Sequence, residues 1–230
     1  MFYDSEARGT GAGNLPLEFN PFKALVAPRP IGWVSTLTES GLVNLAPYSY
    51  FQAVADSPDV VMFSATPELV VQASKPGISF GSERKHSQTN AAQTGEFVCN
   101  IVSYDFAEAM NQTSAHLSAQ HSEAEHAGIA MVPSTNVRTP RVAGCPAALE
   151  CVFLESRPVP SRGGDHRYHM VFGEVVGIHI DEQFISAGRV DTAAMQILTR
   201  MGYDEYALIG DTFSMSRPDN DPVLDGALKS

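Results

Sequence analysis

The chain has 230 residues, of which 43% are hydrophobic and 18% are charged, and its formal net charge is −11. This length suffices for one complete hydrophobic core, and the composition excludes an intrinsically disordered chain. The negative charge disfavours nucleic acid and anionic membranes as partners, so any anionic ligand must be held by a local group of cations.

The ends of the chain and its cysteines indicate the compartment. Residues 1–20 lack a basic segment followed by an apolar run, and no stretch approaches the roughly 20 apolar residues of a membrane span. Cys99, Cys145 and Cys151 form neither a CxxC pair nor a metal-type spacing, which disfavours a disulfide framework or a zinc site. We expect a cytoplasmic protein with an arm (residues 1–20), one domain (residues 21–218) and a tail (residues 219–230).

Strand-forming residues dominate the chain. Residues 30–37 and 42–45 flank the turn residues 39–41 and predict a hairpin. The continuous apolar runs at 60–64 and 97–102 predict strands that are covered on both faces. Further strands are expected at residues 149–153, 170–180 and 207–215.

Helices are expected only as insertions between strands. Ser87 is expected to cap a helix that runs through Thr94 and stops at Gly95. A capping-box pattern predicts a second helix over residues 105–117, and a third is expected over residues 192–201. Many strands with few helices favour an antiparallel barrel with helices outside it, although propensity alone also allows a sandwich.

Residues 79–90 combine cations and hydroxyls just before a predicted helix. Arg84 and Lys85 lie beside Ser82, Ser87 and Thr89. Two cations, several hydroxyls and the free N–H groups of a helix N-terminus suit a phosphate dianion. The alternative is an exposed turn that only caps the helix.

A second candidate segment lies at residues 44–51, where a strand runs into Pro47. Proline cannot donate a ladder hydrogen bond, so pairing is expected to break there and expose backbone groups. Those groups could match the polar edge of a flavin ring, while Tyr48, Tyr50 or Phe51 cover its apolar area. The alternative is an edge strand whose aromatic side chains fill the core.

The segments RPIGWVST (residues 29–36), VNLAPYSYF (43–51) and VMFS (61–64) resemble, in order and spacing, the flavin reductase-like family of FMN-binding split barrels, which includes flavoredoxin. Residues 85–100 resemble the family's Lys-Asp-Thr phosphate segment and the helix and strand after it. The resemblance resumes at Gly173-Glu174-Val175 and at Arg200-Met201-Gly202, so it covers roughly residues 22–218. It implies a mainly β fold, a Greek-key-like split β-barrel with a few peripheral helices.

The resemblance also implies which residues contact FMN. The implied cofactor contacts are Ser35, Asn44, Ala46, Pro47, Tyr48, Ser49, Phe51, Ser64, Arg84, Lys85 and Ser87. This chain has His86 and Ser87 where the family usually has Asp and Thr; a serine hydroxyl still donates, and the role of position 86 stays open. Family members are typically homodimers with FMN near the interface.

A glycine- and histidine-rich segment at residues 163–169 resembles the family's Gly-Asp-His motif near the nicotinamide. His166 or His169 is the implied nicotinamide-placing residue, and the alternative is a polar hairpin tip. His116, His121 and His126 recur every five residues, which does not put two ligands on one helix face, so no metal is expected.

The implied activity is transfer of electrons from NADH or NADPH to FMN. The expected function is an NAD(P)H-dependent FMN reductase that supplies a partner such as a two-component monooxygenase. The alternatives are a flavoredoxin-type electron carrier, a flavin-binding module without redox turnover, and a flavin enzyme with its own substrate, for which residues 119–146 would form a lid.

Overall fold

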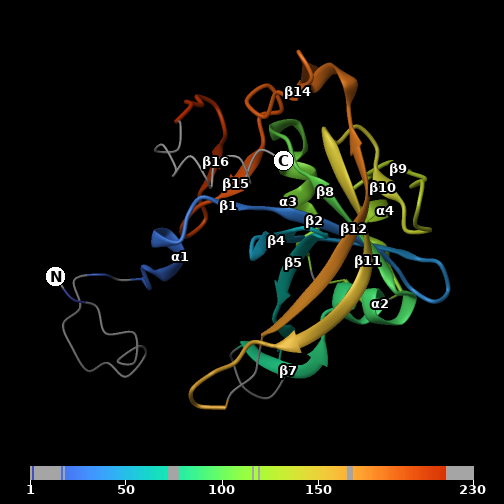
Figure 1. Ribbon diagram of the computed structural model, residues 1–230. Helices are drawn as coiled ribbons and strands as arrows, with labels where there is room; N and C mark the ends of the chain where they lie inside the picture. Colours follow the sequence, from blue (N-terminus) through green and yellow to red (C-terminus); the bar gives the residue numbers. More distant parts are fainter. Residues whose placement is uncertain are drawn as a thin grey trace, which may run out of the picture.

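The structure is a computed structural model that describes residues 2, 17, 19–71, 78–115, 117–118, 120–164 and 168–215. Its main element is a seven-stranded antiparallel sheet with the order β3-β2-β8-β11-β12-β5-β4 (Figure 1). The strands of this sheet are β2 (Gly32–Leu37), β3 (Val43–Tyr48), β4 (Phe51–Asp56), β5 (Asp59–Ala65), β8 (Glu96–Ile101), β11 (Ala147–Pro158) and β12 (His169–Ile180).

The two outermost strands of this sheet, β3 and β4, are consecutive in the chain. Only Ser49 and Tyr50 separate them. The Tyr50 carbonyl accepts a hydrogen bond from the Ser64 N–H of β5 at 2.8 Å. Because a two-residue link cannot cross the width of seven strands, the sheet must curl until its edges meet. The fold is therefore a split barrel, as the sequence predicted.

Shorter elements surround the barrel. The small strands are β1 (Arg29–Pro30), β15 (Leu198–Arg200) and β16 (Tyr206–Leu208) in one sheet, and the pairs β6 (Pro67–Val71) with β7 (Ile78–Arg84), β9 (Met131–Val132) with β10 (Arg141–Val142), and β13 (Ile185–Ser186) with β14 (Arg189–Val190). The helices are α1 (Phe22–Leu25), α2 (His86–Thr94), α3 (Ala107–Gln112) and α4 (Glu123–His126), with 3₁₀ turns η1 (Tyr104–Phe106) and η2 (Glu182–Phe184).

Two clusters of apolar side chains form the core. One fills the barrel and includes Val34, Phe63 and Phe97. The other includes Trp33, Leu45 and Met110 and packs helix α3 against strands β2 and β3. Trp33 is fully buried, and its indole N–H donates to Thr113 Oγ1 at 2.9 Å. This bond fixes the end of α3 over β2.

Gly173 marks a close approach inside the barrel. A Cβ atom at this position would lie 2.3 Å from Cζ of Phe97. The Phe97 ring therefore occupies the space over β12 where a side chain would otherwise stand, and a glycine is required there.

The segment of residues 135–142 is tied to the sheet by buried polar side chains. Glu150 of β11 accepts hydrogen bonds from the backbone N–H groups of residues 135–137. Ser35 donates to the Pro140 carbonyl at 2.7 Å, and Asn100 accepts from the Val142 N–H at 2.8 Å. The 135–142 segment, which lies within the residues 119–146 considered as a lid, is thus fixed by the barrel strands.

Several sequence predictions need correction. Helix α2 begins two residues earlier than predicted, at His86, because its N-cap residue is Lys85 rather than Ser87. Gly95 does stop it in the left-handed conformation, at φ 77°. The helix predicted over residues 105–117 ends at Gln112. The helix predicted over residues 192–201 is absent, because residues 198–200 form β15 and pair with β1 and β16. The strand predicted over residues 207–215 spans only Tyr206–Leu208.

The predicted break of pairing at Pro47 is also wrong. Pro47 stays in register opposite Trp33, and β3 continues to Tyr48. Because β3 is an edge strand of the sheet, a residue without an N–H group is tolerated there. The break begins two residues later, at the link of Ser49 and Tyr50.

Candidate functional site

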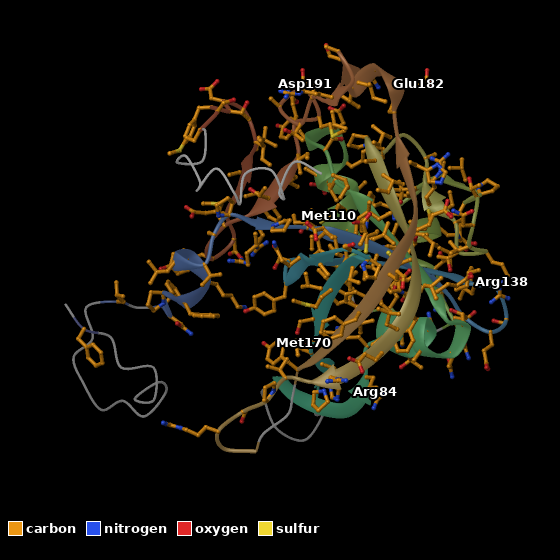
Figure 2. The ribbon with its side chains drawn as sticks, in the orientation of Figure 1. Arg84, Met110, Arg138, Met170, Glu182 and Asp191 are labelled. Atoms are coloured by element: carbon orange, nitrogen blue, oxygen red, sulfur yellow. The ribbon has the colours of Figure 1, made fainter. Side chains whose placement is uncertain are left out.

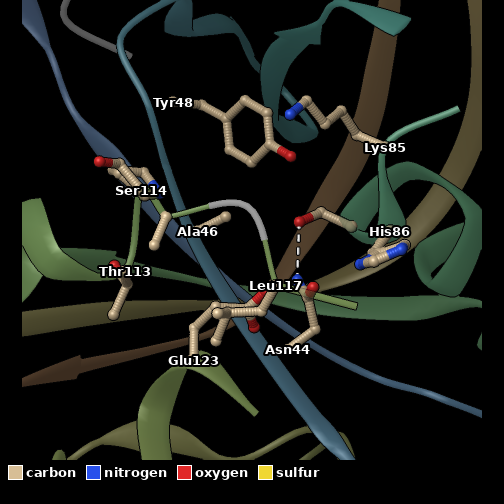
Figure 3. Close-up of a pocket in the computed structure, with 12 residues that line it drawn as sticks. Asn44, Ala46, Tyr48, Lys85, His86, Thr113, Ser114, Leu117 and Glu123 are labelled. Atoms are coloured by element: carbon tan, nitrogen blue, oxygen red, sulfur yellow. Dashed lines mark hydrogen bonds between the residues drawn. The ribbon is translucent and has the colours of Figure 1, made fainter. Parts of the chain in front are cut away.

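A cavity opens between strand β3, the start of helix α2 and the chain after α3 (Figure 3). Asn44, Ala46, Pro47 and Tyr48 come from β3, and Lys85, His86 and Ser87 come from the start of α2. Thr113, Ser114, Ala115, Leu117 and Glu123 complete the lining. Six of the implied cofactor contacts therefore meet in one cavity.

The α2 end of the cavity is rich in hydrogen-bond donors. The N–H groups of His86 and Ser87 fall in the first turn of α2, where a helix offers no internal acceptor. Lys85 stands at the N-cap, and the first turn contains no acidic residue. The positive end of the helix dipole and the lysine therefore act together, which favours an anion at this end of the cavity.

Three side chains form a polar network across the cavity wall. Asn44 Nδ2 donates to Ser87 Oγ at 2.9 Å, as the dashed line in Figure 3 shows. The Tyr48 hydroxyl also interacts with Ser87, which lowers the pKa of Tyr48 less than burial raises it. Burial raises the pKa of Tyr48 to about 12, so this hydroxyl is a neutral donor throughout the physiological range. The network joins β3 to α2 and fixes the orientation of Ser87.

Tyr48 has a second contact inside the barrel. Its ring centroid lies 4.7 Å from that of Phe63, and its exposed fraction is 9%. Phe51 is buried in the same core and does not line the cavity. The alternative of an edge strand whose aromatic residues fill the core thus describes Phe51 fully and Tyr48 in part.

Glu123 is a cavity residue that the sequence did not indicate. It is 5% exposed, and its Oε2 accepts a hydrogen bond from the Leu45 N–H at 3.1 Å. Burial raises the pKa of this carboxyl, which the Leu45 N–H and the nearby His86 and Lys85 only partly offset. An acidic residue in a short helix after a long loop gives no local sign that it faces a cavity.

The remaining implied contacts lie elsewhere. Ser35 is fully buried and bonded to Pro140 and Asn100 outside the cavity lining. Ser64 pairs with Met170 in the barrel wall. Ser49 lines a second cavity next to the first, and the exposed Arg84 lines an open hollow on the other side of His86.

Of the two histidines implied for nicotinamide placement, the structure describes His169 only. His166 lies outside the described residues. His169 begins β12, where it pairs with Ala65 and Pro158. The neighbouring Tyr168 ring lies 6.1 Å from that of Tyr50, so the end of the β11–β12 hairpin reaches the link between β3 and β4.

Among the residues that the structure describes, no helix is long and apolar enough to cross a membrane. The cysteines Cys99, Cys145 and Cys151 are all buried and unpaired by disulfides.

Comparison with known proteins agrees with this fold. An uncharacterized protein of Halalkalibacterium halodurans is 32% identical over 197 residues, which cover 84% of this chain and 87% of that protein. The crystal structure of nitrilotriacetate monooxygenase component B from Bacillus cereus aligns with a TM-score of 0.74 at 28% identity, covering 88% of this chain and all of that one. A flavin reductase structure with a split barrel domain from Shewanella frigidimarina aligns with a TM-score of 0.75 at 20% identity, covering 95% and 100%, and supports the fold alone.

The model of the family described as "Flavin reductase like domain" matches residues 25–188, which include β3, the start of α2 and the cavity between them. The chain therefore belongs to the flavin reductase-like family, whose flavin-related redox chemistry suits the donor-rich cavity described above.

Proposed function

We propose that this protein binds FMN in the cavity between β3 and α2 and reduces it with NADH or NADPH. The observation that carries the proposal is the convergence of Lys85, Ser87 and the first turn of α2 on one end of that cavity. A phosphate dianion there would meet a cation, a hydroxyl and backbone N–H groups, and the chain's net charge of −11 makes such a site locally exceptional.

The donor set of the cavity fits a flavin mononucleotide. Lys85 and Ser87 would hold the phosphate, while Asn44, Ala46 and Tyr48 on the edge strand β3 would face the polar chain and the ring. Bound flavin supplies a hydride acceptor, so the chain itself needs no strong acid or base. The tasks left to the protein are to hold the ring against β3, keep Tyr48 neutral and exclude water.

The match to nitrilotriacetate monooxygenase component B supports a role as the reductase component of a two-component monooxygenase. In such a system the reduced flavin leaves the reductase for a partner enzyme. We further propose a homodimer whose second subunit completes the site, a cytoplasmic location, and a role of His169 or His166 in placing the nicotinamide.

Anaerobic stopped-flow mixing of the FMN-loaded protein with NADH, and separately with NADPH, tests the proposal. Loss of the oxidised flavin absorbance band on mixing is the expected result. Tight FMN binding with no bleaching by either nucleotide would assign the protein to the electron carriers of flavoredoxin type. A protein that takes up no FMN at micromolar concentration would overturn the proposal entirely.

A further inference from the structure

A second cavity of about 250 Å³ adjoins the first, and both are lined by Pro47 and Ser114. Its lining includes three cations, Lys23, Arg29 and Arg200, and no carboxylate. These cations come from α1, β1 and β15, which lie side by side in Figure 1. In a chain with a net charge of −11, three cations without a carboxylate in one cavity favour an anionic ligand.

Arg29 is a buried cation whose charge no described carboxylate balances. It is 6% exposed, and its two Nη atoms donate to backbone carbonyls, among them those of Val26 at 2.6 Å and Met201 at 2.7 Å. Its Nε atom is buried without a hydrogen-bond partner among the residues that the structure describes. Carbonyl oxygens satisfy donors without neutralising the charge, so an anion in this cavity would relieve the cost of burying it.

Arg200 presents a second guanidinium to the same cavity. Its guanidinium carbon lies 4.5 Å from the centroid of the Tyr206 ring. Its ion pair with Asp204, at 3.5 Å, involves a fully exposed carboxylate and therefore competes weakly with a ligand. Its Nη2 also donates to the Tyr203 carbonyl, which together with the Tyr206 ring fixes the guanidinium. A guanidinium fixed in this way is pre-oriented to bind a carboxylate or phosphate through its other N–H groups.

The rest of the lining combines apolar surface with the polar side chains of Ser49, Asn111 and Ser114. Ile31, Pro47 and Met110 contribute aliphatic surface, and Tyr203 and Tyr206 contribute rings. Because a cavity of about 150 Å³ holds a benzene molecule, 250 Å³ leaves room for a ring that carries an anionic group. The lining therefore suits a ligand that is both flat and anionic.

We propose that this second cavity binds the carboxylate or phosphate group of the molecule that exchanges electrons with the flavin, an inference that rests on the proposed function. The shared residues Pro47 and Ser114 place this anion next to the cavity proposed for the flavin. The group has two possible sources, an aromatic acid that is a substrate or the phosphates of the nicotinamide nucleotide.

Calorimetric titration of the purified full chain with benzoate, and separately with ADP-ribose, distinguishes the sources. At least one probe is expected to bind, and the Arg200→Met variant is expected to weaken that binding about tenfold or more, as for loss of a charge-assisted hydrogen bond. Arg138→Met is the matched control, because it removes the same charge from a 73% exposed side chain on the 135–142 segment. Figure 2 labels Arg138 on the opposite side of the molecule from β15, which is labelled in the same orientation in Figure 1.

The inference is overturned if neither probe binds at millimolar concentration, or if the two variants weaken binding equally. FMN uptake is measured on the same samples by flavin fluorescence. If FMN uptake is retained and neither anion binds, only the proposal for the second cavity is overturned. If FMN is not taken up, the proposed function is overturned.

Discussion

Two buried glutamates in this protein stand in opposite electrostatic surroundings. Glu150, under the 135–142 segment, is fully buried and accepts hydrogen bonds from Thr135, Asn136 and Val137 and from the His179 ring. Burial alone would raise the pKa of its carboxyl, but the Thr135 N–H, His179 and the Asn136 N–H outweigh burial and lower it. Its charge is compensated within the fold.

Glu123, in the candidate flavin cavity, has far fewer donors. The Leu45 N–H is the backbone donor to its Oε2 atom, and burial raises the pKa of the carboxyl above its usual value. The difference separates Glu150, a carboxylate that stabilises the fold, from Glu123, a carboxylate that lines the candidate cavity. Donors around Glu150 are used by the fold, whereas Glu123 lies in a cavity that Lys85 and the first turn of α2 also line.

The largest effect is expected from Glu150→Ala. Removing a buried carboxylate that organises four donors should lower the free energy of unfolding by about 3 kcal/mol or more. Because the folded pKa is lowered, the stabilisation is present above the unfolded pKa and is lost as pH falls, so the variant and the wild type should converge in acid. Urea unfolding at pH 7, and at a series of values from pH 5 down to pH 3, measures both effects.

The control for this variant is Glu155→Ala on the same strand, where the side chain is 43% exposed and pairs with Arg157. That change should alter the free energy of unfolding by about 0.5 kcal/mol or less. Equal effects of the two substitutions would show that Glu150 does not hold the 135–142 segment.

An intermediate effect, on binding rather than stability, is expected from Lys85→Met. Loss of a charged donor to the phosphate should weaken FMN binding about 10- to 100-fold. Riboflavin, which lacks the phosphate, should bind the variant and the wild type equally. Fluorescence titration with both flavins gives the comparison. If the variant loses affinity for riboflavin as much as for FMN, Lys85 does not bind the phosphate.

The smallest effect is expected from Glu123→Gln. Since the folded pKa of Glu123 is raised, the ionised carboxylate is unfavourable in the fold, and its cost appears as pH rises above the unfolded pKa. The glutamine amide keeps an acceptor for the Leu45 N–H, so the variant should melt a few degrees higher at pH 8 and match the wild type near pH 4.

Thermal melts at both pH values, with the exposed Glu125→Gln as control, test this sign. A lower melting temperature for Glu123→Gln at pH 8 would mean that the charged form of Glu123 is stabilising. In that case ionisation would stabilise the fold at Glu123 as it does at Glu150, and the two glutamates would not differ.

The sequence predicted the barrel well where local pattern and long-range pairing agree. The alternation and apolar runs of β2, β3, β5 and β8 match the observed strands, and Gly95 ends α2 as expected. The helix predicted over residues 192–201 failed because pairing of Arg200 with Arg29, 171 positions away in the chain, outweighs local helix propensity.

The sequence also predicted the candidate site only in part, because some of its residues lie in recognisable local motifs and others do not. Asn44, Tyr48, Lys85 and Ser87 lie in segments whose motifs resemble the family, and the structure brings them together. Ser114 falls in the helix predicted over residues 105–117, and Glu123 follows in a stretch without strong periodicity. Neither position has a local sign of a cavity, so only tertiary packing reveals them. The cations of the second cavity come from three separate short elements, and no local pattern links them.

The short link of Ser49 and Tyr50 joins barrel closure to ligand binding. Pro47 and Tyr48, just before the link, form a wall of the candidate flavin cavity, while Phe51, just after it, packs inside the barrel. A molecule that binds to β3 therefore also restrains the place where the two edges of the sheet, β3 and β4, meet. Occupancy of the cavity should slow amide hydrogen exchange in β4 and β5, on the far side of that place, as well as in β3 itself.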